Sequence, residues 1–283
     1  MTLAIRLEDV SFTYQGAATP AVADISLAIE EGERIGIVGP NGSGKTTLCH
    51  LLTGFVPHFF PGQLRGIVRV GDLDTSSVGP AQLALSVGRV FDDPFEQLSG
   101  VGMTALEEVA FGLENLALPR EEILVRSEAV LRAVRLWESR ERSPFELSGG
   151  QQQLLAIASI LAMRPHILVL DEPTSQLDPI GTDQVFGALH DLRESGITIV
   201  VTEHKIDTLA SFADRIIVVH DGRCAAMGPP RDVLSSPDIE RWQIEPPMWS
   251  RIAQRLRSGR DTRVCPLPVT RGELMAELSH AAA

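Results

Sequence analysis

The sequence predicts an α/β fold built on a parallel central sheet. Two short and almost entirely apolar runs, HILVLDEP and ITIVVTEH, each end in acidic residues or a histidine. Such runs are typical of buried parallel strands that present polar groups at their carboxyl ends. A third apolar run ends at Gly39 and is followed at once by a glycine-rich turn and a segment with helical spacing. A strand, a loop and a helix in this order indicate a layered α/β core.

The N-terminal part predicts an edge sheet that leads into this core. Residues 3–12 alternate between apolar and polar, and the segment ADISLAIEEGERIGIVG indicates a strand, a turn and a buried strand. Helical spacing then runs from Lys45 to Leu52, and Gly54 stands where that helix is expected to stop.

The middle and the end of the chain have different patterns. The short strand GIVRV follows a glycine- and proline-rich stretch at 59–66, and residues 103–163 have strongly helical spacing, which we interpret as an inserted helical lobe. Asp221 and Gly222 lie between two strand-like runs and predict a hairpin. After residue 237, prolines divide two short helical stretches, which indicates a tail or a small appended lobe.

Composition excludes several classes of function. The chain has 283 residues, 44% of them hydrophobic and 22% charged, with a formal net charge of −12. This composition is that of a soluble globular protein with about two lobes. The negative charge opposes attraction to phosphate backbones and anionic lipids, so we expect no nucleic-acid partner. No apolar run approaches the ~20 residues that span a bilayer, and the start lacks a signal-peptide pattern, so any membrane association is expected to be peripheral.

The cysteines do not predict a disulfide or metal framework. Cys49, Cys224 and Cys265 are odd in number and share no metal-ligand spacing. This pattern suits a reducing cytoplasm, and we interpret each cysteine as a buried thiol.

Residues 39–46, GPNGSGKT, fit the pattern of a phosphate-binding loop. Small residues let consecutive backbone N–H groups surround a phosphate, and the start of the following helix adds partial positive charge. Lys45 is expected to hold the β- and γ-phosphates and Thr46 a Mg²⁺ ion. The position of the motif, between a buried strand and a helix, is the context that this function requires.

Two carboxylates are predicted at the end of a central strand. Four apolar residues precede Asp171 and Glu172. In combination with the phosphate-binding loop, the first acid is expected to support Mg²⁺ and the second to polarise the attacking water as a general base. A strand that ends in two acids is common by itself, so this interpretation depends on the loop.

A second glycine-rich helix start lies at Ser148, Gly149, Gly150 and Gln151, before an apolar helical run. Local physics alone favours a simple interpretation, in which Ser148 caps an amphipathic helix.

These motifs together resemble an ABC-type ATPase subunit. The resemblance rests on the phosphate-binding loop, on LSGGQ before LVLDEP, on SQLD at 175–178 and on His204, and it covers roughly residues 4–235. It implies a P-loop NTPase fold with an edge antiparallel β subdomain, a RecA-like core and an inserted helical subdomain at about 98–163. The ABC ATPase domain is then expected over 1–237 and a C-terminal extension over 238–283.

The resemblance also implies ATP and Mg²⁺ as ligands and a head-to-tail dimer. Each ATP would lie between the phosphate-binding loop of one subunit and the LSGGQ segment of a second ABC ATPase subunit, so Ser148, Gly149, Gly150 and Gln151 would contact the partner's ATP. Two helix N-termini converging on one triphosphate would share its charge. The ATP-binding residues carried over are Tyr14, Gly39, Pro40, Asn41, Gly42, Ser43, Gly44, Lys45, Thr46 and Thr47.

Individual roles carry over by position. Lys45, Glu172 and His204 are expected to be catalytic, with His204 contacting the γ-phosphate. Tyr14, the only tyrosine in the chain, resembles the aromatic that stacks on adenine, although a tyrosine in a core strand is the alternative. Asp178 resembles the acid that communicates across the dimer interface, and its alternative is a helix N-cap.

One position departs from the family pattern. A glutamine normally follows the aromatic residue of the VGRVF segment, but here Asp92 follows Phe91, and Gln97 is five residues too late to replace it. An aspartate offers a hard oxygen ligand for Mg²⁺ but adds negative charge near the γ-phosphate. We expect Asp92 to preserve turnover and to alter its metal dependence.

Three further stretches resemble the ATPases of energy-coupling factor transporters, which import vitamins and transition-metal ions. They are DDPFEQLSG, EEVAFGLENLALPREEI, and the tail segments PPMWSRIAQRLRSG and PLPVTRGEL. The resemblance implies a transmembrane coupling protein and a small substrate-binding membrane protein as partners, at the cytoplasmic face of the cell membrane.

The segment 92–100 would receive the coupling helices, with Phe95 and Leu98 as contact residues unless they only cap the local core. A conventional ABC transporter, a soluble ABC ATPase and a purely ATP-binding regulator remain alternative functions. The sequence leaves open the solute, the choice between homodimer and heterodimer, and the role of the tail.

Overall fold

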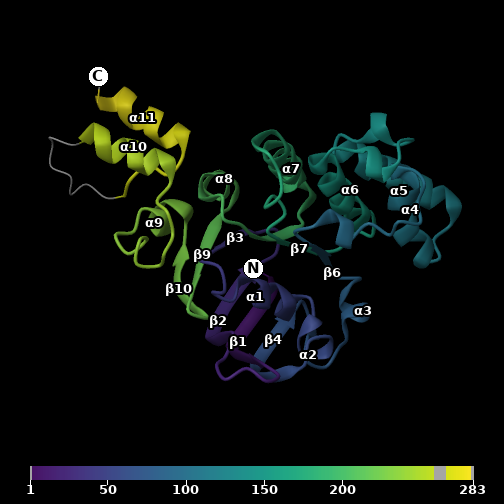
Figure 1. Ribbon diagram of the computed structural model, residues 1–283, viewed down its shortest axis with the longest axis horizontal. Coiled ribbons are helices and arrows are strands. Elements are labelled where there is room, and N and C mark those ends of the chain that lie inside the picture. Colours follow the sequence, from purple (N-terminus) through teal and green to yellow (C-terminus); the bar gives the residue numbers. More distant parts are fainter. Residues whose placement is uncertain (1, 258–265, 282–283) are drawn as a thin grey trace.

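The computed structural model describes residues 2–257 and 266–281, which form two sheets with helices around them (Figure 1). The first sheet is antiparallel, with the order β2-β1-β4-β5. Its strands are β1 Leu3–Tyr14, β2 Val22–Glu30, β4 Gly62–Val70 and β5 Leu73–Asp74. The sequence prediction of an edge sheet is therefore confirmed, and the short strand GIVRV is part of the longer β4.

The second sheet is the predicted parallel core, with the order β10-β9-β3-β8-β7-β6. Its strands are β3 Arg34–Val38, β6 Val87–Val90, β7 Ile167–Asp171, β8 Thr198–Thr202, β9 Arg215–His220 and β10 Arg223–Gly228. All neighbours are parallel except β10, which forms the predicted hairpin with β9. The carboxyl ends of the parallel strands meet at one edge, where α/β sheets bind ligands.

The central sheet is buried on both faces, which explains why its strands are almost entirely apolar. One face packs with the antiparallel sheet and α1 (Lys45–Leu52) in a single hydrophobic cluster. The other face packs against the remaining large helices. Two short helices, α2 (Phe55–His58) and α3 (Pro80–Leu83), connect the sheets.

The predicted helical lobe consists of α4 (Ala105–Asn115), α5 (Arg120–Ala133) and α6 (Gly149–Ala162), which pack together at one end of the molecule (Figure 1). The remaining helices are α7 Pro179–Asp191, α8 Ile206–Phe212, α9 Pro230–Leu234, α10 Met248–Arg257 and α11 Arg271–Ala281. The last two form the predicted appended lobe. Within the described ranges, no helix is both long and apolar enough to cross a lipid bilayer.

The cysteines match the sequence prediction only in part. Cys49 is fully buried, and burial raises the pKa of its thiol well above the ordinary value, so it is a neutral core side chain. The expectation of a buried thiol is wrong for Cys224, which is only partly buried because β10 is the edge strand of its sheet. Cys265 lies outside the described residues.

Candidate functional site

The loop between β3 and α1 approaches other backbone so closely that glycine is required at two positions. A Cβ at Gly39 would lie 2.1 Å from the carbonyl oxygen of Val219, and one at Gly44 would lie 2.6 Å from that of Ala21. Gly44 also has a φ of +107°, in the left-handed region that favours glycine. The glycines of the predicted phosphate-binding loop therefore have a steric cause, and α1 begins at Lys45 as expected.

Lys45 folds back over this loop. Its ammonium donates to the carbonyl oxygens of Gly39 and Pro40 at 3.0 and 3.2 Å. The same nitrogen lies 3.4 Å from Glu172 Oε1 and 3.5 Å from His204 Nε2. The structure thus brings together three residues from the ends of three different segments, all predicted from sequence.

Ser43 adds an unsatisfied polar group to the loop. Its hydroxyl is buried and, among the described residues, has no hydrogen-bond partner. A Cβ placed on Gly39 would lie 2.8 Å from this oxygen, so the hydroxyl stands inside the loop. A buried hydroxyl without a partner is costly, and a bound phosphate oxygen would satisfy it.

Asp171, at the end of β7, binds through both carboxylate oxygens. Oδ1 accepts from Thr202 Oγ1 at 2.8 Å and lies 3.4 Å from Thr46 Oγ1. Oδ2 pairs with the Arg89 guanidinium at 3.2 Å. Asp171 is therefore held in place from three segments, and its Oδ1 and Thr46 form a pair of hard oxygen donors.

Arg89 is the main site residue that sequence analysis missed. Its side chain is almost fully buried on β6, and its guanidinium lies over the rings of Phe55 and Phe91 at 4.9 and 4.8 Å. Nε and Nη1 have no hydrogen-bond partner among the described residues, so the ion pair with Asp171 is its principal polar contact. A charged residue inside the short apolar strand VGRV was the available signal, because a buried charge needs a partner.

Glu172 is held with its side chain toward His204. Its backbone N–H donates to Thr202, to Oγ1 at 2.9 Å and to the carbonyl oxygen at 3.1 Å. Its φ is +50°, an uncommon conformation for a residue with a side chain. His204 Nε2 lies 2.9 Å from Glu172 Oε1. The predicted base and the predicted histidine are therefore in direct contact.

Tyr14 lies beside α1 at the end of β1. Its hydroxyl forms hydrogen bonds with Thr47 Oγ1 at 3.2 Å and His50 Nδ1 at 3.1 Å. Its ring packs edge-on against Phe12 at 4.9 Å between centroids. These contacts place the tyrosine next to the loop and anchor its hydroxyl end in the protein.

His50 is uncharged at neutral pH. Burial, with a smaller contribution from the positive charge of Arg89, lowers its pKa from 6.5 to about 4. Its ring stacks on Phe60 at 4.7 Å between centroids. His50 is thus a neutral ring stacked on an aromatic side chain.

Asp92 is exposed just beyond the end of β6. The neighbouring Gln97 is occupied by the backbone: its amide accepts from Phe91 N at 3.2 Å and donates to the carbonyl oxygens of Arg89 and Ala156 at 3.3 and 3.4 Å. Gln97 therefore holds the loop that presents Asp92.

Ser148 and Asp178 both cap helices. Ser148 and Gln151 form a reciprocal capping box at the start of α6. Asp178 Oδ1 accepts from Gly181 N at 2.7 Å at the start of α7. A Cβ at Gly150 would lie 2.9 Å from Gly181 Cα, so the two helix starts touch. Both simple interpretations of these motifs hold locally, while α6 lies in the helical lobe, apart from α1 (Figure 1).

The donor set fits a magnesium ion that also binds a phosphate. Mg²⁺ prefers oxygen ligands and usually keeps several waters, using one or two protein oxygens together with substrate phosphates. Thr46 Oγ1 and Asp171 Oδ1 supply such a pair. Among the described residues, no group of three or more His, Cys, Asp or Glu forms a metal site.

A phosphate-binding loop after a central strand, with two acids at the end of another strand, defines a P-loop nucleoside triphosphatase. The sequence profile of the ABC transporter family matches residues 22–175. The chain belongs to this family and is the ATP-hydrolysing component of an ABC transporter.

Two archaeal relatives extend the match beyond this range. The chain is 47% identical to a protein of Pyrococcus horikoshii over 84% of this chain and 83% of that protein. It is 43% identical to a protein of Pyrococcus abyssi over 97% of this chain and 98% of that one. Both are provisionally named as ABC transporter ATP-binding proteins.

Solved structures of ABC transporter proteins are similar to this chain in fold. CbiO1 of Clostridium perfringens, described as part of the ABC transporter complex cbiONQ, aligns with a TM-score of 0.76 and 31% identity over 85% of this chain and 94% of that chain. The dimeric cassette MJ0796 bound to ADP and phosphate aligns with a TM-score of 0.68 and 32% identity over 80% and 99%. The predicted P-loop ABC ATPase fold is confirmed.

Proposed function

We propose that this chain energises a membrane importer of the energy-coupling factor type, which carries a vitamin or a transition-metal ion. The proposed ATP hydrolysis rests on the cluster of Lys45, Glu172 and His204 at the carboxyl ends of the central strands. The similarity to cbiO1, a component of a cbiONQ complex, supports the type of importer.

In the proposed mechanism, Lys45 releases its loop carbonyls and binds the β- and γ-phosphates of ATP. Glu172 Oε1 accepts a hydrogen bond from the attacking water and polarises it as a general base. His204, 2.9 Å from that oxygen, orients Glu172 and contacts the γ-phosphate. A Mg²⁺ ion held by Thr46 and Asp171, with Asp92 as a further ligand, would neutralise charge on the phosphates.

We propose a dimer in which each ATP lies between two ABC ATPase subunits. Ser148, Gly149, Gly150 and Gln151 would contact the ATP of the partner, and Asp178 would relay its presence. The exposure of Ser148, Gly149 and Asp178 supports this arrangement, because these residues are free to meet another subunit. The dimeric state of the similar cassette MJ0796 also supports it. The domain boundaries proposed are 1–237 for the ATPase domain and 238–283 for the extension.

An exposed aromatic pair supports docking to a transmembrane coupling protein. Phe95 and Phe145 are each 57% exposed, and their rings stack nearly parallel at 6.2 Å. Phe145 lies three residues before Ser148, so a partner that contacts this pair would also contact the segment leading to α6. Val101 and Met103 are exposed further along the segment that contains Phe95. Leu98 is partly buried and packs against the hydrophobic core, which favours the alternative that it caps the local core.

The proposed location is the cytoplasmic face of the cell membrane, reached through a coupling protein and a small substrate-binding membrane protein. The test is affinity purification of the tagged chain from detergent-solubilised membranes of its host, followed by mass spectrometry. Recovery of both membrane proteins is expected. Recovery of a conventional permease pair would assign another type of ABC transporter, and recovery without any membrane protein would refute membrane coupling.

A further inference from the structure

Two loops at the carboxyl ends of β7 and β8 are joined by a buried carboxylate. Glu203 is 1% exposed, and its Oε1 accepts from the backbone N–H groups of His204 and Lys205 at 2.8 and 3.3 Å. Its Oε2 accepts from Thr174 Oγ1 at 2.5 Å. Because these hydrogen bonds satisfy a buried charge, Glu203 fixes the backbone on both sides of His204.

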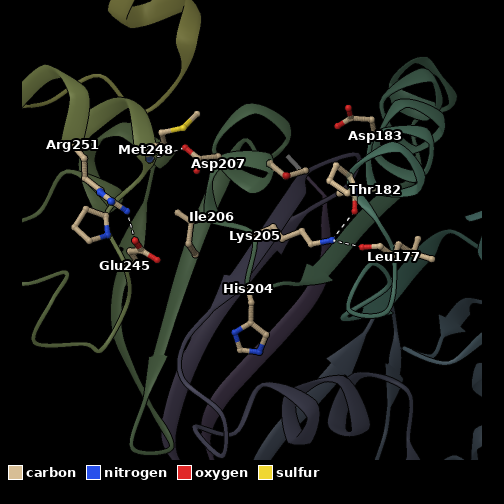
Figure 2. Close-up of a pocket in the computed structure, with 13 residues that line it drawn as sticks. Leu177, Thr182, Asp183, His204, Lys205, Ile206, Asp207, Glu245, Met248 and Arg251 are labelled. Atoms are coloured by element: carbon tan, nitrogen blue, oxygen red, sulfur yellow. Dashed lines mark hydrogen bonds and ion pairs between the residues drawn. The ribbon is translucent and has the colours of Figure 1, made fainter.

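Lys205 makes a second link between the same loops. Its ammonium donates to the carbonyl oxygen of Leu177 at 3.3 Å and to Thr182 Oγ1 at 2.6 Å (Figure 2). It also donates to the carbonyl oxygen of Thr174 at 2.8 Å. An ammonium has three donors, and all three are used. Thr182 Oγ1 in turn donates to the carbonyl oxygen of Asp178 at 2.9 Å. Lys205 therefore binds the turn 174–178 directly at Thr174 and Leu177, and Thr182 links it to Asp178.

The choice of lysine at this position is unusual for the chain. Lysine occurs only at positions 45 and 205, whereas the other 23 cationic side chains are arginines. Both lysines donate to backbone carbonyl oxygens that converge on one point. An ammonium directs three N–H bonds from one nitrogen to acceptors that surround it. A planar guanidinium spreads its N–H bonds over three nitrogens and cannot serve acceptors gathered around one point. The geometry at position 205 therefore requires an ammonium and not simply a positive charge.

The link lies at the edge of an open space. A cavity of about 470 Å³ adjoins it, with Leu177, His204 and Lys205 on one wall and Glu245 and Met248 on another (Figure 2). Asp178 is exposed next to the cavity. The turn is thus accessible from outside on one side and tied to His204 on the other.

We propose that Lys205, together with Glu203, is a positioning residue for ATP hydrolysis. Lys205 makes the position of His204 relative to Glu172 depend on the position of the turn 174–178. The inference rests on the proposed dimer, in which Asp178 and its turn face the partner subunit. Closure of the dimer then sets the contact between His204 and Glu172 through Lys205.

The test is the change Lys205→Met, with kcat and KM for ATP measured on the full chain. We expect kcat to fall at least about tenfold and KM to change less than about threefold, because the phosphate-binding loop is untouched. In a His204→Ala background, the same change is expected to lower kcat by less than about twofold, since the residue through which Lys205 acts is absent. An equal loss of kcat in both backgrounds, or a rise in KM alone, would refute the positioning role.

If the Tm of Lys205→Met shows that this variant is unfolded, a second pair of variants tests the proposal instead. Thr182→Val removes the hydroxyl that joins Lys205 to Asp178, whereas Thr182→Ser keeps it. We expect a several-fold lower kcat for Thr182→Val and at least about half of the wild-type value for Thr182→Ser. Equal kcat values in the two variants would overturn the proposal.

The outcome is separable from that of the proposed function. These kinetics need no membrane partner, so they do not depend on the type of transporter. Absence of ATP-driven dimers in the Glu172→Gln variant would refute the dimer on which the inference rests. If dimers still form and Lys205→Met lowers kcat equally with and without His204, the positioning role alone is refuted.

Discussion

Arg89 and Asp171 form an ion pair, 3.2 Å long, between two side chains that are each less than a tenth exposed. Removing one partner of a buried pair leaves an uncompensated charge. We therefore expect Arg89→Met to lower the free energy of unfolding by about 3–5 kcal/mol, measured by urea denaturation without nucleotide. The double variant Arg89→Met/Asp171→Asn should recover much of this loss, because the buried charge is then gone.

The control for this change is Arg223→Met, which breaks the exposed pair between Arg223 and Asp24. Exposed pairs contribute at most about 1 kcal/mol. If Arg89→Met costs no more than this control, the buried pair does not stabilise the site.

Glu172→Gln is expected to bind ATP and to accumulate as a closed dimer. The amide keeps the size of the side chain but removes the base that polarises water, so ATPase activity should fall at least about a hundredfold. Size-exclusion chromatography with and without ATP measures the dimer, and phosphate release measures turnover. Normal turnover in this variant would remove Glu172 from the base role.

Asp92→Gln is expected to change the metal dependence of turnover. The exposed carboxylate near the end of β6 is a hard oxygen donor, whereas the amide is neutral and binds Mg²⁺ more weakly. ATPase activity as a function of Mg²⁺ and of Mn²⁺ concentration provides the measurement. Identical activation curves for wild type and variant would show that Asp92 does not act on the metal.

Phe95→Ala is expected to reduce transport and to preserve the ATPase activity of the isolated chain. The Phe95 ring stacks on that of Phe145, both rings are exposed, and neither residue is assigned to ATP or Mg²⁺. Phe145→Ala should behave in the same way. Val125→Ala, at a similarly exposed position on α5, is the control and should leave transport unchanged. An equal loss of transport and ATPase activity after Phe95→Ala would contradict a coupling role.

The low pKa of His50 predicts a loss of stability in mild acid. The folded state holds this side chain neutral down to about pH 4, whereas the unfolded chain protonates it near 6.5. The unfolded state therefore binds more protons between these values, and the free energy of unfolding should fall as pH decreases from about 6.5 to 4. Urea midpoints at pH 7.5 and 5.0 measure the effect.

His50→Phe keeps an aromatic ring beside Phe60 and removes the titrating group. Its urea midpoint should fall less between the two pH values than that of wild type. His190→Phe changes an exposed histidine on α7 and should leave the pH dependence as it was. If His50→Phe retains the full pH dependence, other groups cause it.

Local patterns were sufficient to predict most of the fold and part of the site. The phosphate-binding loop, the acids after β7 and the histidine after β8 each occupy one contiguous segment, so spacing and burial reveal them. The parallel arrangement of strands then brings Lys45, Glu172 and His204 together at one edge, as their positions at strand ends imply.

The contacts that hold this cluster could not be read from local patterns. Arg89 pairs with Asp171, which is 82 positions later in the sequence, and Lys205 binds the carbonyl oxygen of Thr174, which is 31 positions earlier. Such pairings depend on which strands become neighbours. The exposure of Phe95 was predicted correctly, whereas Leu98 is partly buried against the hydrophobic core, a tertiary contact that the local pattern does not reveal.

The order of strands in the central sheet also affects how the protein is made. β3 carries the phosphate-binding loop, and both of its neighbours, β8 and β9, come from residues 198–202 and 215–220. At a synthesis rate of about 5–20 residues per second, the loop leaves the ribosome on the order of ten to thirty seconds before these strands exist. ATP therefore cannot stabilise the completed loop in the nascent chain until β8 and β9 have been made, because β3 has no neighbouring strands before then.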